Sequence, residues 1–181
     1  MNTIGGFCFG EHYKDAHMAK IKQENSIAEK MLNWMINPFN IMYFCGNVGN
    51  GKTYFAASWY NLLRETKKNV RVFTDQTFFS HLMTCMSNGT DPLWELSRIC
   101  ECDYFILDDL GSCKLSDWKA EILLEFINLR GSNNKPTLIT SNLTKEDMRK
   151  EHHPRLVSRL FSTKNAYLEV NGPDRRLCDY E

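Results

Sequence analysis

Short apolar runs alternate along this chain with stretches in which apolar residues recur every three or four positions. Residues 41–45 form an uninterrupted apolar run, and the segment after them places its apolar residues at helical spacing: Phe55, Ala56, Trp59, Tyr60 and Leu63. A run of that length is typical of a strand buried in a parallel sheet, and the wider spacing is typical of a helix with one apolar face. The pattern predicts a strand followed directly by a helix.

The same alternation continues through the rest of the chain. Further strands are predicted at 70–73, 104–109, 137–140 and 166–170, helices at 23–36, 76–86, 92–100 and 117–130, a loop at 131–135, and a short helix that opens at Thr144. Strands that alternate with helices are typical of an α/β fold with a parallel sheet. At 181 residues the chain has room for one domain. We expect residues 1–40 to form a linker and a helix that pack on a core of residues 41–181.

Composition and charge narrow the function classes. The 43% hydrophobic and 24% charged content is that of an ordinary globular protein. Lys plus Arg and Asp plus Glu number 22 each, so any DNA contact must come from a local patch rather than from bulk charge. Residues 1–10 lack the basic start of a signal peptide, and no apolar run approaches a membrane span. We expect a cytoplasmic protein with no membrane partner.

The cysteines indicate neither a disulfide framework nor a zinc site. They are seven in number and include no C-x-x-C pair: Cys8, Cys45, Cys85, Cys100, Cys102, Cys113 and Cys178. Cys100 and Cys102 are close enough to share a metal, but they lack neighbouring histidines. The simpler interpretation is a pair of reduced thiols packed near the start of a strand.

A glycine-rich stretch lies between the first strand and its helix: Gly46, Asn47, Val48, Gly49, Asn50, Gly51, Lys52 and Thr53. It fits the pattern G-x-x-x-x-G-K-[ST] in the strand and helix context that this pattern requires. The loop N–H groups and the helix N-terminus form an anion site. We expect this loop and the following Tyr54 to bind a nucleotide, with Lys52 on the β and γ phosphates and Thr53 on Mg²⁺. The alternative is a glycine-rich turn that merely ends in Lys-Thr.

Two carboxylates end the strand predicted at 104–109. Asp108 and Asp109 follow four buried positions, and ligands of parallel sheets bind at the C-terminal ends of the strands. Asp108 is placed to hold Mg²⁺, and Asp109 is placed to orient or deprotonate an attacking water. An isolated Asp-Asp pair is more often an acidic turn. The phosphate loop upstream of it favours the catalytic interpretation.

The strand predicted at 137–140 delivers Ser141 and Asn142 to the same edge. The Asn142 amide is suited to hydrogen-bond a γ-phosphate or the attacking water, and it is equally suited to a plain turn. Farther along, Arg155 and Arg159 are four residues apart on one helical face. A pair of arginines, Arg175 and Arg176, lies close to the C-terminus.

Taken together these motifs resemble the AAA+ ATPases, and within them the DnaC/IstB group of helicase loaders and transposition helpers. The resemblance spans roughly residues 11–177 and is most specific at four stretches: 46–53, 105–111, 135–142 and 155–160. It implies a P-loop NTPase fold of AAA+ type, with a five-stranded parallel sheet in the order 5-1-4-3-2 flanked by helices. It also implies ATP and Mg²⁺ as cofactors. From this resemblance we expect neither a full lid nor the N-terminal domain that such loaders usually carry.

The resemblance implies three further roles. Asn142 resembles sensor 1, and Arg159 resembles the arginine finger that reaches a neighbouring subunit's γ-phosphate, which would make hydrolysis depend on an ATP-dependent homo-oligomer. Arg176 fits the sensor 2 position better than Arg175. Many AAA+ proteins have Asp-Glu where this chain has Asp108-Asp109, so the shorter second acid implies slow hydrolysis.

The function that the resemblance favours is an ATPase of DNA replication that assists a replicative DNA helicase and binds single-stranded DNA. An IstB-like ATPase that serves a transposase is the nearest alternative. More distant alternatives are a non-hydrolysing ATP-dependent adaptor with an inert Asp109 and a small kinase that acts on a nucleotide or a metabolite. Aromatic residues after the second strand are candidates for base stacking, helped by Lys68 and Arg71, although helical spacing favours core packing for them: Phe78, Phe79, His81 and Trp94.

Overall fold

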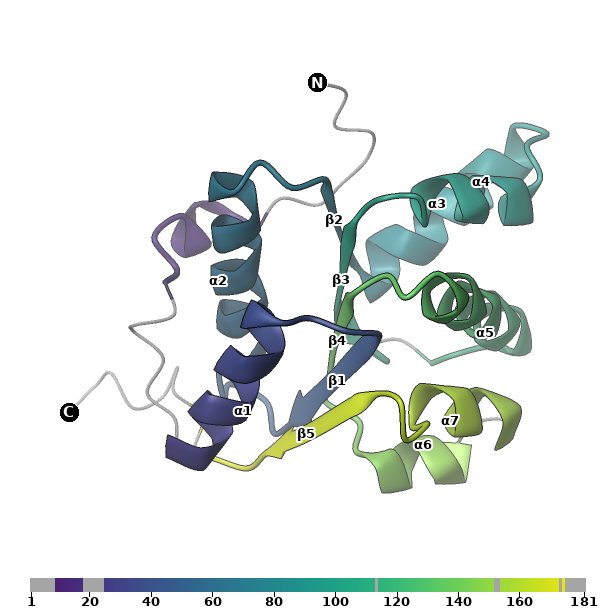
Figure 1. The fold of residues 1–181 in the computed structure, drawn as a ribbon. Coiled ribbons are helices and arrows are strands. Elements are labelled where there is room, and N and C mark those ends of the chain that lie inside the picture. The colour runs from purple at the N-terminus through teal and green to yellow at the C-terminus, as the bar shows by residue number, and fades with distance from the viewer. Residues whose placement is uncertain (1–8, 18–24, 113, 152–153, 173, 175–181) are drawn as a thin grey trace.

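The computed structural model describes residues 9–17, 25–112, 114–151, 154–172 and 174. It contains one five-stranded sheet with helices on both faces (Figure 1). The strands are β1 Ile41–Gly46, β2 Val70–Thr74, β3 Tyr104–Leu110, β4 Thr137–Ser141 and β5 Ala166–Val170. The helices are η1 Glu11–Tyr13, α1 Asn25–Ile36, α2 Lys52–Glu65, α3 Asp75–Ser87, α4 Pro92–Ile99, α5 Asp117–Ser132, α6 Lys145–Glu151 and α7 Pro154–Leu160.

The strand order is β2-β3-β4-β1-β5, and every neighbouring pair is parallel. This is the predicted order 5-1-4-3-2 read from the opposite edge, so the predicted topology is confirmed. Because all strands run the same way, the residues that follow β1, β3 and β4 meet at one edge of the sheet. The predicted loop at 131–135 starts too early, since α5 continues through Ser132 before it ends at Asn133.

Successive residues of β1 enter different cores, as the alternation of a strand requires. Met42 and Phe44 pack toward α1 and α2, whereas Ile41, Tyr43 and Cys45 pack toward the helices on the other face. In Figure 1, α1 and α2 lie on one side of the sheet, and α3 to α7 lie on the other. The continuous apolar run therefore reflects a strand that is buried on both faces.

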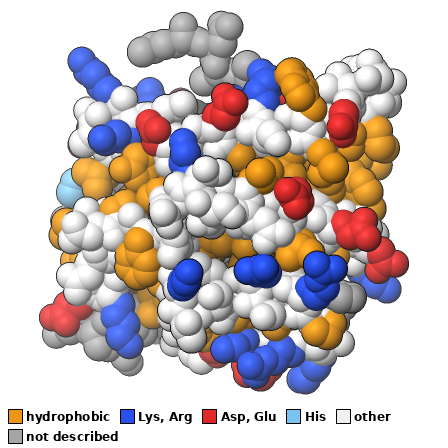
Figure 2. Space-filling view, turned by 45° about the vertical axis from the view of Figure 1, so that its right-hand side comes forward, with side chains coloured by type: hydrophobic (Ala, Val, Ile, Leu, Met, Phe, Trp, Pro, Cys, Tyr) orange, Lys and Arg blue, Asp and Glu red, His pale blue; other side chains and the backbone are white. Residues whose placement is uncertain are grey.

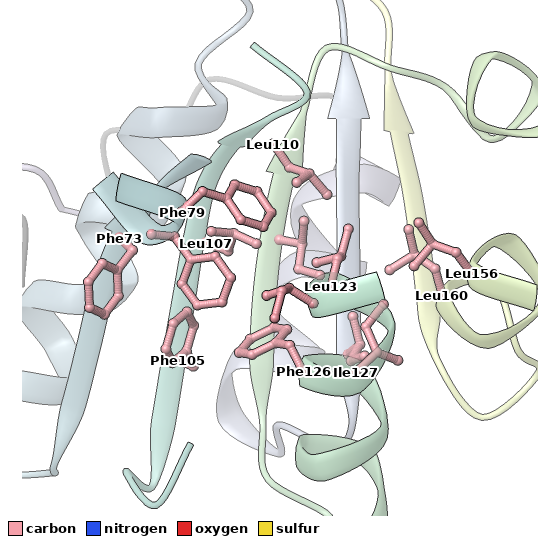
Figure 3. Close-up of a cluster of buried hydrophobic side chains, with 14 of the residues drawn as sticks. Phe73, Phe79, Phe105, Leu107, Leu110, Leu123, Phe126, Ile127, Leu156 and Leu160 are labelled. Carbon is pink, nitrogen blue, oxygen red and sulfur yellow. The ribbon is translucent and has the colours of Figure 1, made fainter. Parts of the chain in front are cut away.

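Aromatic rings join the sheet to α5 in the larger of these cores (Figure 3). The rings of Phe73 and Phe105 stack with centroids 5.6 Å apart, and Phe126 of α5 meets Phe105 edge-on at 4.8 Å. Phe78 and Phe79 of α3 are also fully buried in this core. Core packing is thus their structural role, and the base-stacking hypothesis is wrong for these two rings. Trp94 differs, because 58% of its surface is exposed.

Arg130 organises the loop that leads into β3. Its guanidinium is fully buried and donates to the carbonyl oxygens of Cys100, Cys102 and Pro136 at 3.0, 2.6 and 2.6 Å. The thiols of Cys100 and Cys102 are free and buried beside it. Burial raises the pKa of both thiols, which keeps them protonated. These cysteines are reduced thiols near the start of a strand, as expected.

The described part of the N-terminal segment lies against α2. The side-chain amide of Asn61 donates to the carbonyl oxygens of Tyr13 and Ala16 at 3.1 and 3.0 Å. On the neighbouring helix α1, the ring of Trp34 lies 4.8 Å from that of Trp59 of α2. Among the described residues, no helix is long and apolar enough to cross a membrane.

Candidate functional site

The loop after β1 has the conformation that its glycines allow. Gly46, Gly49 and Gly51 adopt positive φ angles of 151°, 74° and 97°, which side chains disfavour. A Cβ built on Gly46 would lie only 1.8 Å from the carbonyl oxygen of Val170, so this position has no room for a side chain. Gly51 is the N-cap residue of α2 and has no side chain to cover the first-turn N–H groups. The loop and the helix N-terminus together suit an anion.

Lys52 lies folded over this loop. Its ammonium donates to the carbonyl oxygens of Gly46 and Asn47 at 2.8 and 2.7 Å, and to Oδ1 of Asn50 at 3.2 Å. Asn50 is itself buried, and its Nδ2 donates to the carbonyl oxygen of Val170 at 2.6 Å. The side chain of Asn50 therefore ties the loop to the end of β5, a contact that the motif alone did not reveal.

Asp108 joins three elements of the sheet edge. Its Oδ2 accepts a hydrogen bond from the Thr53 hydroxyl at 3.1 Å, and its Oδ1 accepts one from the Thr140 hydroxyl at 2.6 Å. The side chain is 3% exposed, and this burial raises the pKa of its carboxyl above the usual range. Hydroxyl and carboxylate oxygens are the ligands that Mg²⁺ prefers, so Thr53 and Asp108 form a donor set that fits this ion.

Asp109 occupies an irregular point of β3. Its φ is 58°, and the register of β3 against β4 shifts between Leu107 and Leu110. Its backbone N–H donates to the Thr140 hydroxyl at 2.9 Å, and its Oδ1 accepts from Nδ2 of Asn142 at 3.0 Å. At this irregular point the regular pairing of β3 with β4 is interrupted, and the Asp109 carboxylate lies beside Asn142.

Thr140 is the residue that sequence reasoning missed. Its hydroxyl donates to Asp108 and accepts from the N–H of Asp109, so one side chain orders both acids. Thr140 could have been found from the sequence only by pairing the predicted third and fourth strands in parallel. The register that sets Phe105 opposite Thr137 and Leu107 opposite Ile139 brings Asp108 level with Thr140.

Asp174 is a second residue without an expected role. A Cβ built on Gly49 would lie 1.7 Å from Oδ1 of Asp174, so this carboxylate rests directly on the loop. Arg176, two positions later, lies outside the described residues. Tyr54 lies in the first turn of α2, where its hydroxyl accepts from the N–H of His17 at 3.3 Å.

Arg159 does not join this cluster. It lies on α7 and lines a cleft of about 390 Å³ between α5 and α7. Arg155, Ser158 and Asn128 line the same cleft, which is therefore polar and basic. In Figure 1, α7 covers the face of the sheet opposite α2. The structure thus brings together the predicted residues of the loop, β3 and β4, and places the predicted arginine elsewhere.

Two curated relatives are similar to most of this chain. The replicative helicase loader DnaC of Escherichia coli (strain K12) is 27% identical over 134 residues, which are 74% of this chain and 55% of that protein. The chromosomal replication initiator protein DnaA of Ureaplasma parvum is 26% identical over 144 residues, which are 78% of this chain and 30% of that protein. The chain therefore spans about half the length, or less, of these relatives.

Solved structures share the fold. A crystal structure of the DnaC helicase loader superposes with a TM-score of 0.75 at 23% identity, over 89% of this chain and 99% of that one. AMPPCP-bound DnaA from Aquifex aeolicus superposes with a TM-score of 0.75 at 17% identity, over 90% and 52% of the two chains. The strand order and flanking helices are those of the AAA+ P-loop fold.

A family model described as IstB-like ATP-binding protein matches residues 11–154. The match includes the phosphate loop, both aspartates and Asn142, and it ends before Arg159. With the fold and the loop geometry in agreement, the chain belongs to the family of IstB-like ATP-binding proteins.

Proposed function

We propose that this protein binds ATP with Mg²⁺, hydrolyses it as a homo-oligomer, and uses that cycle to assist a replicative DNA helicase on single-stranded DNA. The observation that carries the proposal is that one acid of β3 contacts the phosphate loop and the other contacts the residue that follows β4. Thr53 meets Asp108 at 3.1 Å, and Asn142 meets Asp109 at 3.0 Å. Phosphoryl transfer requires a metal-binding pair and a water-positioning pair side by side.

The loop supplies the phosphate site. Backbone N–H groups at Gly49 to Thr53 would bind the phosphate oxygens, and the α2 N-terminus would add its positive dipole end. The Lys52 ammonium, which now donates to loop carbonyls, would transfer its hydrogen bonds to the β and γ phosphates. The exchange replaces neutral acceptors by charged ones, which makes stronger hydrogen bonds.

Thr53 and Asp108 would hold Mg²⁺, which neutralises charge on the β and γ phosphates. A water molecule positioned by Asp109 and Asn142 would attack the γ-phosphorus. The bond from the γ-phosphorus to the bridging oxygen breaks, ADP leaves with the electron pair, and Asp109 accepts the water proton. Asn142 already orients Oδ1 of Asp109, so its amide serves this step without rearrangement of the backbone.

The place of Arg159 favours action on a second subunit. It lies with Arg155 in the α5–α7 cleft, on the face of the sheet that α2 does not cover. An arginine there would reach the γ-phosphate bound to a neighbouring copy rather than the one in its own loop. Such arginines contribute about 10³ to 10⁵ in rate.

Two observations support the nucleic-acid and helicase parts of the proposal. The relative with 55% of its length covered is a replicative helicase loader. Basic residues also gather in the lower part of the face shown in Figure 2, where α6 and α7 lie, and four of them are exposed: Arg149, Lys150, Arg155 and Arg159. A local basic patch of this kind suits a phosphate backbone, although the bulk charge is zero.

The first experiment measures molar mass by light scattering with ADP, with a non-hydrolysable ATP analogue, and with the analogue plus single-stranded DNA. Wild type is compared with Arg159→Ala, and Arg64→Ala serves as the control because Arg64 is an exposed arginine in the last turn of α2, outside the basic patch. We expect assembly with the analogue and ATP hydrolysis that only Arg159→Ala abolishes. A monomer under every condition would contradict the oligomeric mechanism.

The DNA and partner roles need separate assays. Fluorescence anisotropy with a labelled single strand at low salt should show binding that depends on ATP, and its absence would remove the DNA role.

The match to the IstB-like family model favours, as a second candidate, an ATPase that serves a transposase. Pull-down against a replicative helicase and against a transposase distinguishes this candidate from the helicase-assisting one. Single-turnover hydrolysis on the assembled protein excludes a purely ATP-binding adaptor if ADP is formed.

A further inference from the structure

Three metal-ligating side chains meet between α3 and α4, away from the phosphate loop. His81 and Cys85 are four residues apart on α3, so they share one helical face, and Glu95 faces them from α4. One donor atom from each residue lies within 4.8 Å of the other two. None of these residues belongs to the phosphate loop or to the acids at the end of β3.

The three side chains lie close to the spacing of a tetrahedral metal site. His81 Nε2 lies 2.7 Å from Oε1 of Glu95 and 3.8 Å from Sγ of Cys85. Zinc at about 2.0–2.1 Å from nitrogen and oxygen and about 2.3 Å from sulfur places its ligand atoms about 3.3–3.6 Å apart. For a metal to enter, the His81–Glu95 contact would have to lengthen and the His81–Cys85 contact would have to shorten, each by less than about 1 Å.

The Glu95 carboxylate is buried and is oriented by Arg98. Its side chain is 3% exposed, and Arg98 donates to both carboxylate oxygens at 2.8 Å. These two hydrogen bonds match the guanidinium to an ionised carboxylate. An ionised carboxylate offers about four acceptor positions, and Arg98 uses two of them. Oε1 keeps a position for a metal while Arg98 orients the group from outside, as partners of metal ligands do.

The other two ligands are packed in place yet accessible. The His81 ring lies 6.0 Å from the ring of Phe73, and its side chain is 22% exposed. The N–H of Thr90 donates to the carbonyl oxygen of Cys85 at 2.9 Å, which fastens the turn between the two helices. A metal ion can therefore enter from solvent and complete its coordination with water.

We propose that His81, Cys85 and Glu95 form a Zn²⁺ site that fastens α3 to α4, with water in the fourth position. The metal replaces the hydrogen bond between His81 and Glu95, any proton on His81 Nε2 moves to Nδ1 or to solvent, and the Cys85 thiol releases its proton to solvent when it becomes a ligand. The mixed nitrogen, sulfur and oxygen set favours Zn²⁺ over Mg²⁺ or Ca²⁺, which prefer oxygen alone. Metal binding to the folded state stabilises it by mass action.

Spacing of cysteines did not reveal this site because it contains only one of them. Helical i, i+4 spacing brings in the histidine, and the glutamate comes from the next helix. The proposal is independent of the ATPase function, since the phosphate loop and β3 contribute none of its ligands.

The test uses untagged, metal-free protein titrated with Co²⁺ and then with Zn²⁺. A four-coordinate cobalt site with a thiolate gives strong visible bands and a sulfur-to-cobalt charge-transfer band, which zinc then removes. We expect one equivalent of either metal per chain and a higher melting temperature with zinc. The Cys85→Ser variant should lose the charge-transfer band, and His81→Ala should weaken zinc binding by about tenfold or more.

Thr84→Ala is the control, because Thr84 is exposed on the same helix. It should bind cobalt and zinc as wild type does. Circular dichroism and ATP-analogue binding verify that each variant is folded. A wild-type protein with no saturable band, or a band that persists in Cys85→Ser and so belongs to another of the seven cysteines, would overturn the proposal and leave His81 and Glu95 as a hydrogen-bonded pair alone.

Discussion

The side-chain amide of Asn142 donates to Oδ1 of Asp109 at 3.0 Å, across the ends of two neighbouring strands. This contact exists because Asp109 adopts a φ of 58° beside the irregular pairing of β3 and β4. Asp and Asn tolerate that left-handed conformation better than longer side chains do. The conformation gives a physical reason for a second Asp where many AAA+ proteins have Glu.

Replacement of Asp109 by Asn should separate hydrolysis from binding. Asn preserves the size and the left-handed tolerance of the position but cannot accept the proton of water. We expect ATP hydrolysis to fall by about 10² to 10⁴ while nucleotide affinity changes little. Steady-state turnover and equilibrium binding of a fluorescent ATP analogue provide the measurement. Glu121→Gln on the exposed face of α5 is the control, and an Asp109→Asn variant with wild-type turnover would refute the assignment of Asp109.

Asp108→Asn should make the ligand-free protein more stable at neutral pH. Burial raises the pKa of the Asp108 carboxyl, so the folded state favours its protonated form, and the ionised form costs stability as pH rises through that pKa. Asn is always neutral and can still contact Thr53 and Thr140. The gain in unfolding free energy should therefore vanish at pH values below the unfolded-state pKa of Asp, about 3.9, and grow toward pH 7.

Urea denaturation in chelator at several pH values measures this effect of Asp108→Asn. The same variant should lose the stabilisation that Mg²⁺·ATP gives to wild type, because Asp108 no longer offers a charged ligand to the ion. A variant that is less stable than wild type at pH 7 would show that the two threonine contacts, rather than burial, dominate at this position.

Substitutions of Gly46 and Gly131 by alanine test how much room each position has for a side chain. Gly46→Ala should lower the free energy of unfolding by about 1–3 kcal/mol, because its Cβ would lie 1.8 Å from the backbone carbonyl oxygen of Val170. This oxygen belongs to the backbone of β5, so it can move away only if the strand moves. Gly131→Ala should stabilise by about 0.5–1 kcal/mol, since Gly131 lies inside α5 with nothing within 4 Å of the new Cβ. Thermal and urea unfolding compare the two, and equal effects of the two substitutions would contradict the steric argument.

Asn50→Ala should weaken both the fold and nucleotide binding. It leaves the carbonyl oxygen of Val170 without the donor that lies 2.6 Å away, which costs about 1–3 kcal/mol for a buried acceptor. It also removes the side chain that holds the phosphate loop against the end of β5, so the loop is less well preorganised for the phosphates. Urea unfolding and ATP-analogue titration check the two effects separately. Asn47→Ala is the comparison, because only the backbone carbonyl of Asn47 contacts Lys52.

The sequence by itself determined the elements and the chemistry that local patterns encode. Apolar runs marked the five strands, glycines marked the phosphate loop, and two acids followed a buried strand, while the family resemblance supplied the strand order. These features depend on neighbours a few residues away, so periodicity and motif spacing contain them. The roles of Asp109, Asn142 and Arg159 stay predictions, as does the role of Arg176.

Only the tertiary structure decided which side chains meet. Thr140 bridges to Asp108 across 32 positions, and Asn50 reaches Val170 across 120. The tertiary structure also buries Phe78 in the core and leaves Trp94 on the surface, although both lie at helical spacing. It brings Glu95 of α4 against His81 of α3. Such contacts depend on strand register, on a local irregularity at Asp109 and on the angle between two helices. These are set by the packing of distant segments, which no local pattern specifies.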